Sequence, residues 1–448
     1  MELTIQTLAE IVGGRLRMAA MPPLGGWWEP IAHVVTDLRE VGPGDVLIAS
    51  DDLLAQRPCW NAEAFDRGAL GVIHAGPGLE PWAGRFSIQV QDTAWALWQV
   101  ARTARSEFNG QIITVAGSVG KTITCSMIRT VLGLASGTDL ELSAALPSQV
   151  LRLANSERCA VLETDAEDDG EFDAAMHLSM PHVFVGIHLP DSVHATSIML
   201  PDDSQLIVGP TAGALPTEKR HTAQITFGRH SSCDVTATHV LCRPGELSFV
   251  VDGQLANLPV WGRHLLDNAL AAWAVGRAMG VCDADIATRL ARVHLPAARC
   301  EVMHASGMTF INDNVGMSPQ ARFAALELLD MVDAARRIVV CQSDHSDDAG
   351  HDLNFNRWNE FVEVGGADLL IALGHGADDI IAGATRAGMP ASHCMRCADS
   401  HGAAKEISTF LQKDDVLLFS GVDLEVVQRV LAPFQNTVSD ATARSAAA

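Results

Sequence analysis

The chain has 448 residues, of which 48% are hydrophobic, and its 54 acidic and 31 basic residues give a formal net charge of −23. This balance, without a block of lysine and arginine, argues against nonspecific binding to DNA, RNA or an anionic membrane. No run approaches the roughly 18 uninterrupted apolar residues of a membrane span, and the acidic, amphipathic start does not resemble a signal peptide. We therefore expect a cytoplasmic protein of several domains, without nucleic acid or membrane as its partner.

The first third of the chain alternates between helical and strand-like segments. Apolar residues at helical spacing predict an amphipathic helix over 5–12, and the runs "DVLIAS" and "LGVIHA" are typical of strands. These segments predict a small N-terminal α/β domain, which we place at residues 1–108.

The stretch "ITVAGSVGKTITCSM" (113–127) raises the question of a phosphate-binding loop. A β-branched run precedes the glycines, and apolar residues at helical spacing follow them. In a strand, turn and helix of this order, backbone N–H groups and the helix dipole face an anion. Lys121 adds a positive charge, and the Thr122 hydroxyl can ligate Mg²⁺. The full Walker spacing would need glycine at Val115, so this is a shortened form. The alternative is a surface turn followed by an incidental lysine.

The rest of the middle segment predicts a parallel sheet with an antiparallel addition. The short apolar runs "CAVLETD", "HVFVGIHL" and "QLIVG" are typical of buried parallel strands. Alternation between residues 223 and 260 predicts an antiparallel hairpin with Asp252-Gly253 at its turn, and an alanine-rich helix is expected over 267–279. We therefore expect a central, ATPase-like P-loop domain over residues 109–298.

The last third alternates again. Strands are expected at "MTFINDN", "RRIVVCQ", "ADLLIALG" and "DVLLFSG", with helical stretches between them. This order predicts a doubly wound, Rossmann-like domain over residues 299–436. The small, polar tail over 437–448 is expected to be disordered. The predicted fold class is therefore α/β, with three domains.

Ten cysteines are scattered along the chain, as expected for reduced thiols. The close pair Cys394 and Cys397 follows His393, but a second ligand pair at comparable spacing is missing. We expect two unlinked thiols there rather than a metal or redox site.

A succession of motifs resembles the Mur ligase family of ATP-dependent amide-bond-forming enzymes. In order, these are the glycine loop, "VLETDAEDDGEFD", "HLPDSVHA", "GRHLLDNALAA", "PAARCEV" and "INDNVGMSP". The opening "VTDLREVGPGDVLIAS" with "DRGALGVI" resembles the UDP-binding domain of members that act on UDP-sugar peptides. The resemblance spans nearly the whole chain. It implies that ATP activates a carboxylate of a UDP-sugar peptide as an acyl-phosphate, which the amine of an amino acid or dipeptide then attacks.

The resemblance also implies cofactors, partners and a setting. ATP and Mg²⁺ are the expected cofactors, and peptidoglycan biosynthesis for the cell wall is the expected process. The expected partners are a small-molecule donor and an amine acceptor. We expect a monomer, with other cell-wall enzymes as candidate protein partners.

Matched positions imply a nucleotide and metal site. The positions on the family's phosphate loop are Gly117, Ser118, Gly120, Lys121 and Thr122. Glu163 matches the family's Mg²⁺-binding glutamate, and a carboxylate at a strand's carboxyl end suits a metal-bound triphosphate. His194 matches a histidine that helps to hold a second metal. Thr122, Glu163 and His194 are thus the implied metal ligands. A solvated loop acid and a histidine without a ligand role are the alternatives.

Further matches concern the nucleotide and the donor. Asn268 matches the asparagine that contacts adenine, and its alternative is a polar residue at a helix start. Arg299 and Asp313 match residues that approach the nucleotide when the domains close. With Lys121, Glu163 and His194, Asp313 completes the implied catalytic set. The implied UDP-binding residues are Thr36, Asp37 and Arg39.

The chain also departs from the family pattern. A lysine that is carbamylated in many members, some dozen residues after the position of His194, is missing, and Asp202 or Asp203 could supply the charge instead. The family's C-terminal Lys-Gly-Ser-Arg segment is replaced by "FSGVD", and a glycine-rich segment after "LIAS" by "DDLLAQRPCWN". Three hypotheses therefore remain: an active ligase with an altered acceptor, a catalytically weakened homologue that binds nucleotide or a partner, and an unrelated P-loop ATPase.

Overall fold

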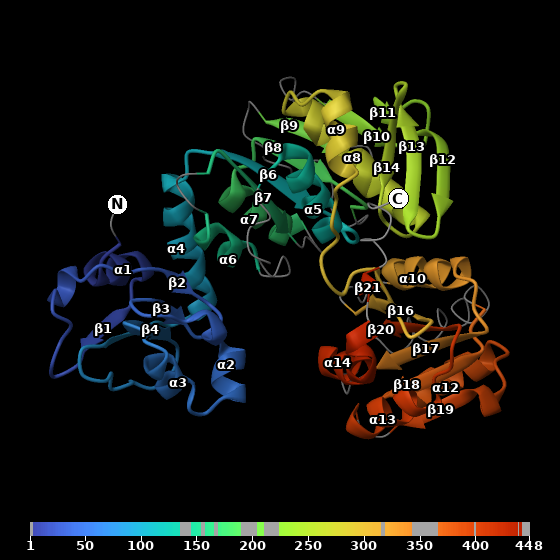
Figure 1. Cartoon of the computed structure of the whole chain (residues 1–448). Helices are drawn as coiled ribbons and strands as arrows, with labels where there is room; N and C mark the ends of the chain where they lie inside the picture. Colours follow the sequence, from blue (N-terminus) through green and yellow to red (C-terminus); the bar gives the residue numbers. More distant parts are fainter. Residues whose placement is uncertain are drawn as a thin grey trace. The chain divides into compact units, whose positions relative to one another are not determined.

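The structure is a computed structural model that describes residues 3–134, 145–153, 157–164, 169–189, 204–209, 224–314, 319–342, 366–397, 400–437 and 439–440 (Figure 1). The chain divides into two compact units, each described by itself. The first contains Met1–Thr114, Leu140–His182 and Thr196–Ser204, and the second contains Val115–Asp139, Val183–Ala195 and Gln205–Ala448.

The first unit opens with a five-stranded sheet in the order β1-β5-β4-β3-β2. Its strands are β1 (Arg15–Met18), β2 (Val34–Val35), β3 (Val46–Ile48), β4 (Gly71–His74) and β5 (Phe86–Gln89). The strands β2 to β5 pair in parallel, and β1 pairs antiparallel with β5. Its helices are α1 (Ile5–Val12), α2 (Asp51–Gln56), α3 (Trp60–Asp66) and α4 (Thr93–Glu107).

Successive side chains of β3 point to opposite faces of the sheet, and an apolar cluster lies on each face. Val46 and Ile48 share one buried cluster with residues of α1 and α4, and Leu47 shares another with residues of α3. The helix α1 begins at a capping box between Thr4 and Thr7, as its sequence pattern allows. The predicted helix over 5–12 is thereby confirmed.

A six-stranded sheet follows in the order β11-β10-β9-β8-β6-β7. Its strands are β6 (Gln111–Ala116), β7 (Cys159–Thr164), β8 (Val183–Gly186), β9 (Gln205–Val208), β10 (Gln224–Gly228) and β11 (Val235–Thr236). The pair β8–β9 is parallel, as the apolar runs predict. The strands β10 and β11 also pair in parallel within this sheet, so the prediction of an antiparallel segment from residue 223 onward is wrong for these two strands. The helices of this region are α5 (Lys121–Leu132), α6 (Leu146–Leu151), α7 (Asp169–Ser179), α8 (Leu266–Ala278) and α9 (Asp283–Leu290).

The antiparallel addition is a three-stranded sheet of β12 (Thr238–Arg243), β13 (Glu246–Val251) and β14 (Gln254–Leu258). Asp252 and Gly253 join β13 to β14 with φ values of 46° and 83°. Both residues have a left-handed backbone conformation, as the central residues of a type I′ hairpin turn require. The predicted hairpin is confirmed.

The last part of the chain forms a seven-stranded sheet in the order β19-β18-β17-β20-β16-β15-β21. Its strands are β15 (Glu301–Ala305), β16 (Met308–Asp313), β17 (Arg336–Gln342), β18 (Leu369–Leu373), β19 (Cys394–Cys397), β20 (Asp415–Ser420) and β21 (Ser439–Asp440). The strands from β19 to β16 run parallel, and β15 and β21 are antiparallel. Its helices are α10 (Pro319–Met331), α12 (Ala377–Arg386), α13 (Ser400–Phe410) and α14 (Leu424–Leu431).

Helices cover both faces of this sheet. One buried cluster joins α10 and α12 to Ile311 of β16, and the other joins α13 and α14 to Phe310, its neighbour on the same strand. Adjacent strand residues face opposite sides, so this is the doubly wound arrangement that the sequence predicts. The α/β fold class is confirmed, whereas the domain boundaries at residues 108 and 298 stay predictions.

Candidate active site

The predicted phosphate loop joins β6 to α5 and depends on two glycines. A Cβ on Gly117 would lie 1.7 Å from the Ile187 carbonyl oxygen, and a Cβ on Gly120 would lie 2.5 Å from Nδ2 of Asn268. Gly120 also has a φ of 80°. Only glycine tolerates these close approaches and this backbone conformation. Both positions therefore require glycine, and the phosphate-binding role of the loop stays a prediction.

The polar groups of the loop are held by hydrogen bonds. The Ser118 backbone N–H and Oγ both donate to the His188 carbonyl, at 3.0 and 2.6 Å. Lys121 Nζ donates to the Gly117 carbonyl at 2.8 Å, so the ammonium group lies at the loop. Thr122, in the first turn of α5, is buried. The sequence order of strand, glycine turn and helix is thus confirmed, with the cation at the helix N-terminus.

Asn268 lies in the first turn of α8 and is buried. Its Nδ2 donates to the Gly120 carbonyl and to Thr124 Oγ1, each at 2.9 Å. These two bonds use both donor hydrogens of the side-chain amide. Asn268 therefore fixes the loop to α8, a role that its sequence position did not indicate. The contact with adenine stays a prediction.

Glu163 is near the carboxyl end of β7 and is buried, with 6% of its surface exposed. A reciprocal pair holds its backbone: Gln149 Nε2 donates to the Glu163 carbonyl, and the Glu163 N–H donates to Gln149 Oε1, both at 2.9 Å. Glu163 belongs to the first unit and the phosphate loop to the second. His194, Asp202 and Asp203 lie outside the described residues.

Asp313 is the last residue of β16 and is buried. Its Oδ1 accepts hydrogen bonds from the Cys300 N–H at 3.1 Å and from the Cys300 thiol at 3.7 Å. Burial raises the pKa of Asp313 to about 6, although the Cys300 donors and the nearby Arg299 oppose this rise. No hydrogen-bond partner for the buried Oδ2 exists among the described residues.

His264 stands on the other side of the Cys300 thiol, in the 3₁₀ turn η3 (Arg263–Leu265) before α8. Its Nε2 lies 3.5 Å from Cys300 Sγ. Burial, with a smaller effect of the positive charge of Arg229, lowers the pKa of His264 to about 4, so the ring is neutral at neutral pH. Neither Cys300 nor this contact was singled out by the sequence.

The segment that replaces the family's Lys-Gly-Ser-Arg lies at the end of β20. Asp423 and Gln342 exchange two hydrogen bonds: Gln342 Nε2 donates to Asp423 Oδ2 at 2.8 Å, and the Asp423 N–H donates to Gln342 Oε1 at 3.1 Å. The Val422 N–H donates to Asn314 Oδ1 at 2.9 Å. The carboxyl ends of β16, β17 and β20 are therefore joined here through polar side chains.

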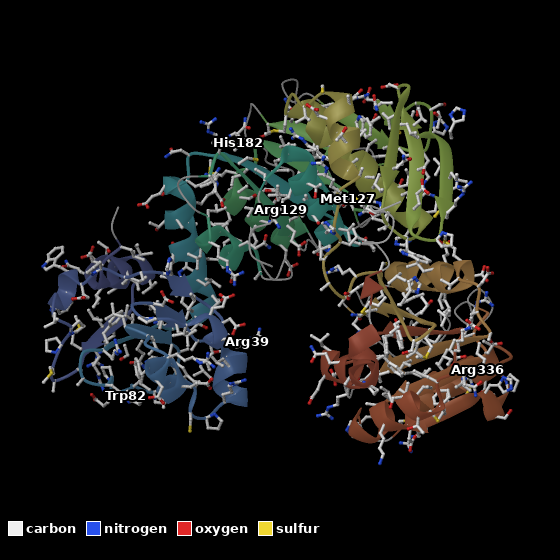
Figure 2. All side chains as sticks on the ribbon, in the orientation of Figure 1. Arg39, Trp82, Met127, Arg129, His182 and Arg336 are labelled. Atoms are coloured by element: carbon white, nitrogen blue, oxygen red, sulfur yellow. The ribbon has the colours of Figure 1, made fainter. Side chains whose placement is uncertain are left out.

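The predicted donor residues line a pocket of about 310 Å³ within the first unit. Its lining is Thr36, Asp37, Leu38, Arg39, Leu53, Arg57, Ala145, Ser148 and Arg152. Thr36 Oγ1 and Ser148 Oγ lie 3.2 Å apart. All three residues implied for UDP are thus brought together, and Figure 2 labels one of them, Arg39.

Three arginines give the pocket its charge, and each is paired with a carboxylate. Arg39 binds Asp37 through its side chain, which lowers the pKa of that carboxyl. Arg57 binds Glu63 at 3.1 Å, and Arg152 binds Glu40. Only the carboxylate of Asp37 lines the pocket, so the lining carries more positive than negative charge. The pocket can therefore accept an anionic group.

The sequence did not indicate Arg57, Ser148 or Arg152 as site residues. Arg57 lies in the segment that replaces the family's glycine-rich continuation. Far along the chain, Ser148 lies on α6 and Arg152 follows directly after that helix. No local pattern links three residues so widely spaced, and only the fold brings them to one pocket.

Several known proteins similar to the chain are Mur ligases. It is 28% identical over 356 residues to the UDP-N-acetylmuramoyl-tripeptide–D-alanyl-D-alanine ligase of Bacillus subtilis, with 74% of this chain and 76% of the relative covered. The MurF structure from Acinetobacter baumannii matches with a TM-score of 0.71 at 21% identity, and covers 98% of this chain and 99% of that one. MurF from Thermotoga maritima in complex with ADP matches with a TM-score of 0.65 at 19% identity, over 90% and 97% of the two chains.

The similarity to these relatives indicates the class of enzymes to which the protein is related. The chain is homologous to the Mur ligases at low identity, as the order of its motifs predicts. Among these enzymes it is a homologue of MurF, the UDP-N-acetylmuramoyl-tripeptide–D-alanyl-D-alanine ligase. No protein-family model matches the chain.

Proposed function

We propose that the chain is an ATP-dependent ligase that joins a carboxylate of a UDP-sugar peptide to the amine of an amino acid or dipeptide. The phosphate loop carries this proposal, because its two glycines, its lysine and its attachment to α8 form the structure that a nucleotide triphosphate requires. The likeness to MurF supports the same reaction. The relative from Thermotoga maritima, solved with ADP, supports ATP as the nucleotide.

The residues of this chain have distinct tasks in the proposed reaction. Lys121 neutralises charge on the transferring γ-phosphate, while the loop N–H groups hold the other phosphates. The donor carboxylate takes the γ-phosphoryl group, and the acceptor amine then attacks the acyl carbon and releases phosphate. Arg299 and Asp313 are proposed to act at the nucleotide.

The residues present fit a magnesium ion. Glu163, buried near the carboxyl end of β7, supplies a carboxylate oxygen, the hard donor that Mg²⁺ prefers. Thr122, which the resemblance implies as a further ligand, supplies a hydroxyl oxygen. The ion would supply electrostatic stabilisation of the triphosphate. His194 stays a predicted further ligand, and no group of three or more metal-binding side chains occurs among the described residues.

The pocket of the first unit supports an anionic donor. Arg39, Arg57 and Arg152 can contact phosphate oxygens, and the hydroxyls of Thr36 and Ser148 can donate to them. A nucleoside diphosphate carries this charge on two adjacent groups. We therefore propose that the diphosphate of a UDP-linked donor binds there.

A second candidate is a weakened homologue that binds nucleotide or a partner without turnover. The pairing of Asp423 with Gln342 favours it, because an acid stands in the segment where the resemblance leads us to expect lysine and arginine. The missing lysine after the position of His194 points the same way.

One experiment separates the two. Phosphate release from ATP is measured with a panel of UDP-sugar peptides and amines, and ATP binding is measured by calorimetry. Turnover with one donor and one acceptor supports the ligase, whereas tight ATP binding without turnover on the whole panel supports the weakened homologue.

The setting also remains proposed. In the part of the chain that the structure describes, no helix has the length and apolar character needed to cross a membrane. A cytoplasmic location, a monomeric state, association with other cell-wall enzymes and a role in peptidoglycan synthesis stay predictions.

A further inference from the structure

The turn that leads into β15 has a costly backbone conformation. Ala298 and Cys300 have φ values of 58° and 49°, in the left-handed region that residues other than glycine rarely adopt. These two residues flank Arg299. Such a conformation persists only where the surroundings hold it in place, and it then fixes the direction of the residue between.

Hydrogen bonds hold this turn against the end of β16. The Asn314 N–H donates to the Ala298 carbonyl, and the Cys300 N–H donates to Asp313 Oδ1, both at 3.1 Å. Glu301 Oε2 accepts from the Ala298 N–H at 3.1 Å and from Asn312 Nδ2 at 3.0 Å. The backbone on both sides of Arg299 is thereby attached to the C-terminal sheet.

The Cys300 thiol ties the same turn to the nucleotide-binding part of the second unit. Sγ lies between His264 Nε2 and Asp313 Oδ1. His264 precedes the helix that carries Asn268, whose side chain holds Gly120 of the phosphate loop. Upstream of the turn, in the segment 291–300 that connects α9 to β15, the His294 carbonyl accepts a hydrogen bond from Ser126 Oγ of α5 at 2.9 Å. The turn around Arg299 is therefore attached to the C-terminal sheet on one side and to the segments next to the phosphate loop on the other.

Arg299 itself is available for a ligand. Its side chain is partly buried and makes no hydrogen bond or ion pair with any described residue. Burial raises the pKa values of Asp313 and Cys300, and the positive charge of Arg299 opposes both rises, so the guanidinium lies close to these two side chains. A partly buried guanidinium with free donors suits a phosphate group.

We propose that Cys300 is a positioning residue, held between His264 and Asp313, which fixes the left-handed turn that presents Arg299 to a bound nucleotide. This inference rests on the proposed function, because it needs Arg299 to act on ATP. In this inference, Cys300 and the buried carboxylate of Asp313 both orient Arg299.

The test is a mutant cycle on ATP affinity, measured by calorimetry with ATP and Mg²⁺. Arg299→Ala should weaken binding about tenfold, as loss of a charge-assisted contact implies. Cys300→Ala should weaken it about threefold. Cys300→Ser, which keeps a donor, should fall between Cys300→Ala and the unmodified protein. The double variant should bind like Arg299→Ala alone, because a residue that acts only through Arg299 has no further effect once Arg299 is gone.

The matched control is Cys341→Ala. Cys341 is buried in the same apolar cluster as Cys300, but on β17. Its removal should leave ATP affinity unchanged. Hydrogen exchange of the Cys300 amide provides a reading that does not need activity, and it should be slow in the unmodified protein and faster in Asp313→Ala.

Each other outcome overturns the inference. Unchanged affinity in Cys300→Ala, or independent losses that multiply in the double variant, would show that the cysteine does not act through Arg299. If Arg299→Ala binds ATP normally while Lys121→Ala does not, the positioning inference fails and the proposed nucleotide site stands. If neither substitution affects ATP binding, the proposed function fails as well.

Discussion

Asn268 and Gly120 are joined by a 2.9 Å hydrogen bond from the asparagine Nδ2 to the glycine carbonyl, and the same Nδ2 donates to Thr124 Oγ1. The side chain thus connects the N-terminus of α8 to the loop and to the helix that follows the loop. Because Asn268 is buried, removal of its amide leaves the Gly120 carbonyl and the buried Thr124 Oγ1 without this donor, which costs free energy.

Asn268→Ala should therefore loosen the phosphate loop. We expect ATP affinity to fall about tenfold and stability to fall by about 1–3 kcal/mol, the usual cost of losing buried hydrogen bonds. Calorimetry and denaturant unfolding measure the two effects. Asn109→Ala is the control, because that amide is exposed and donates to the nearby Glu107 carbonyl at 3.2 Å. Equal behaviour of the two variants would contradict the role of Asn268.

Lys121→Ala should remove turnover while leaving the fold intact. The ammonium is placed to follow charge on the transferring phosphate, and its loss should lower the rate by about three orders of magnitude or more. Thermal unfolding should change little, since Lys121 Nζ donates to the Gly117 carbonyl within its own loop. Lys405→Ala, on the exposed surface of α13, is the control. A normal rate in Lys121→Ala would remove the loop from the mechanism.

The donor pocket offers a matched pair of arginines. Arg57 and Arg67 both bind Glu63 at 3.1 Å, but only Arg57 lines the pocket. Arg57→Ala should raise the KM for a UDP-linked donor about tenfold without changing the KM for ATP, because one charge-assisted phosphate contact is lost. Arg67→Ala should change neither constant. A similar rise in both variants would show that the effect comes from Glu63 rather than from the pocket.

The raised pKa of Asp313 predicts a pH-dependent stability. The carboxyl has a pKa of about 6 in the fold and about 4 when unfolded, so folding favours its protonated form. The stabilisation of the fold by protonated Asp313 is fully present below about pH 4 and is lost as the pH rises through about 6. Asp313→Asn cannot ionise, so its free energy of unfolding relative to the unmodified protein should rise by about 1–3 kcal/mol between pH 4 and pH 7. A difference that stays constant with pH would show that Asp313 does not titrate in this way.

The missing lysine predicts indifference to bicarbonate. A carbamylated lysine depends on dissolved CO₂, and none of the residues between Lys121 and Lys219 is a lysine. Activity should therefore be the same with and without added bicarbonate. Replacing Asp202 and Asp203 together with asparagine should raise the Mg²⁺ concentration required for activity. An unaltered requirement would exclude these two aspartates as ligands.

The fold could be predicted from local patterns because those patterns have local causes. Apolar spacing fixes α1, the Asp252-Gly253 pair fixes its hairpin, and short apolar runs give the buried parallel strands. The phosphate loop was found for the same reason, since its strand, turn and helix are adjacent in the chain.

The rest of the site could not be predicted in this way. Arg57 and Arg152 meet at one pocket only because α6 follows the phosphate loop and returns to the first unit. The position of Cys300 between His264 and Asp313 joins three separate segments. The role of Asn268 depends on which side-chain atom faces the loop, and no spacing rule contains that information.

The short helix α6 contacts two different parts of the proposed site, and this affects how the kinetics of variants are interpreted. Ser148 and Arg152 face the donor pocket, whereas Gln149, between them in the chain, holds the backbone of Glu163. If Glu163 binds the metal and the pocket binds the donor, as we propose, a substitution that tilts α6 would disturb both sites together. To separate the two effects in kinetic measurements, a variant should change only the end of the Ser148, Gln149 or Arg152 side chain and keep the helical backbone of α6 intact.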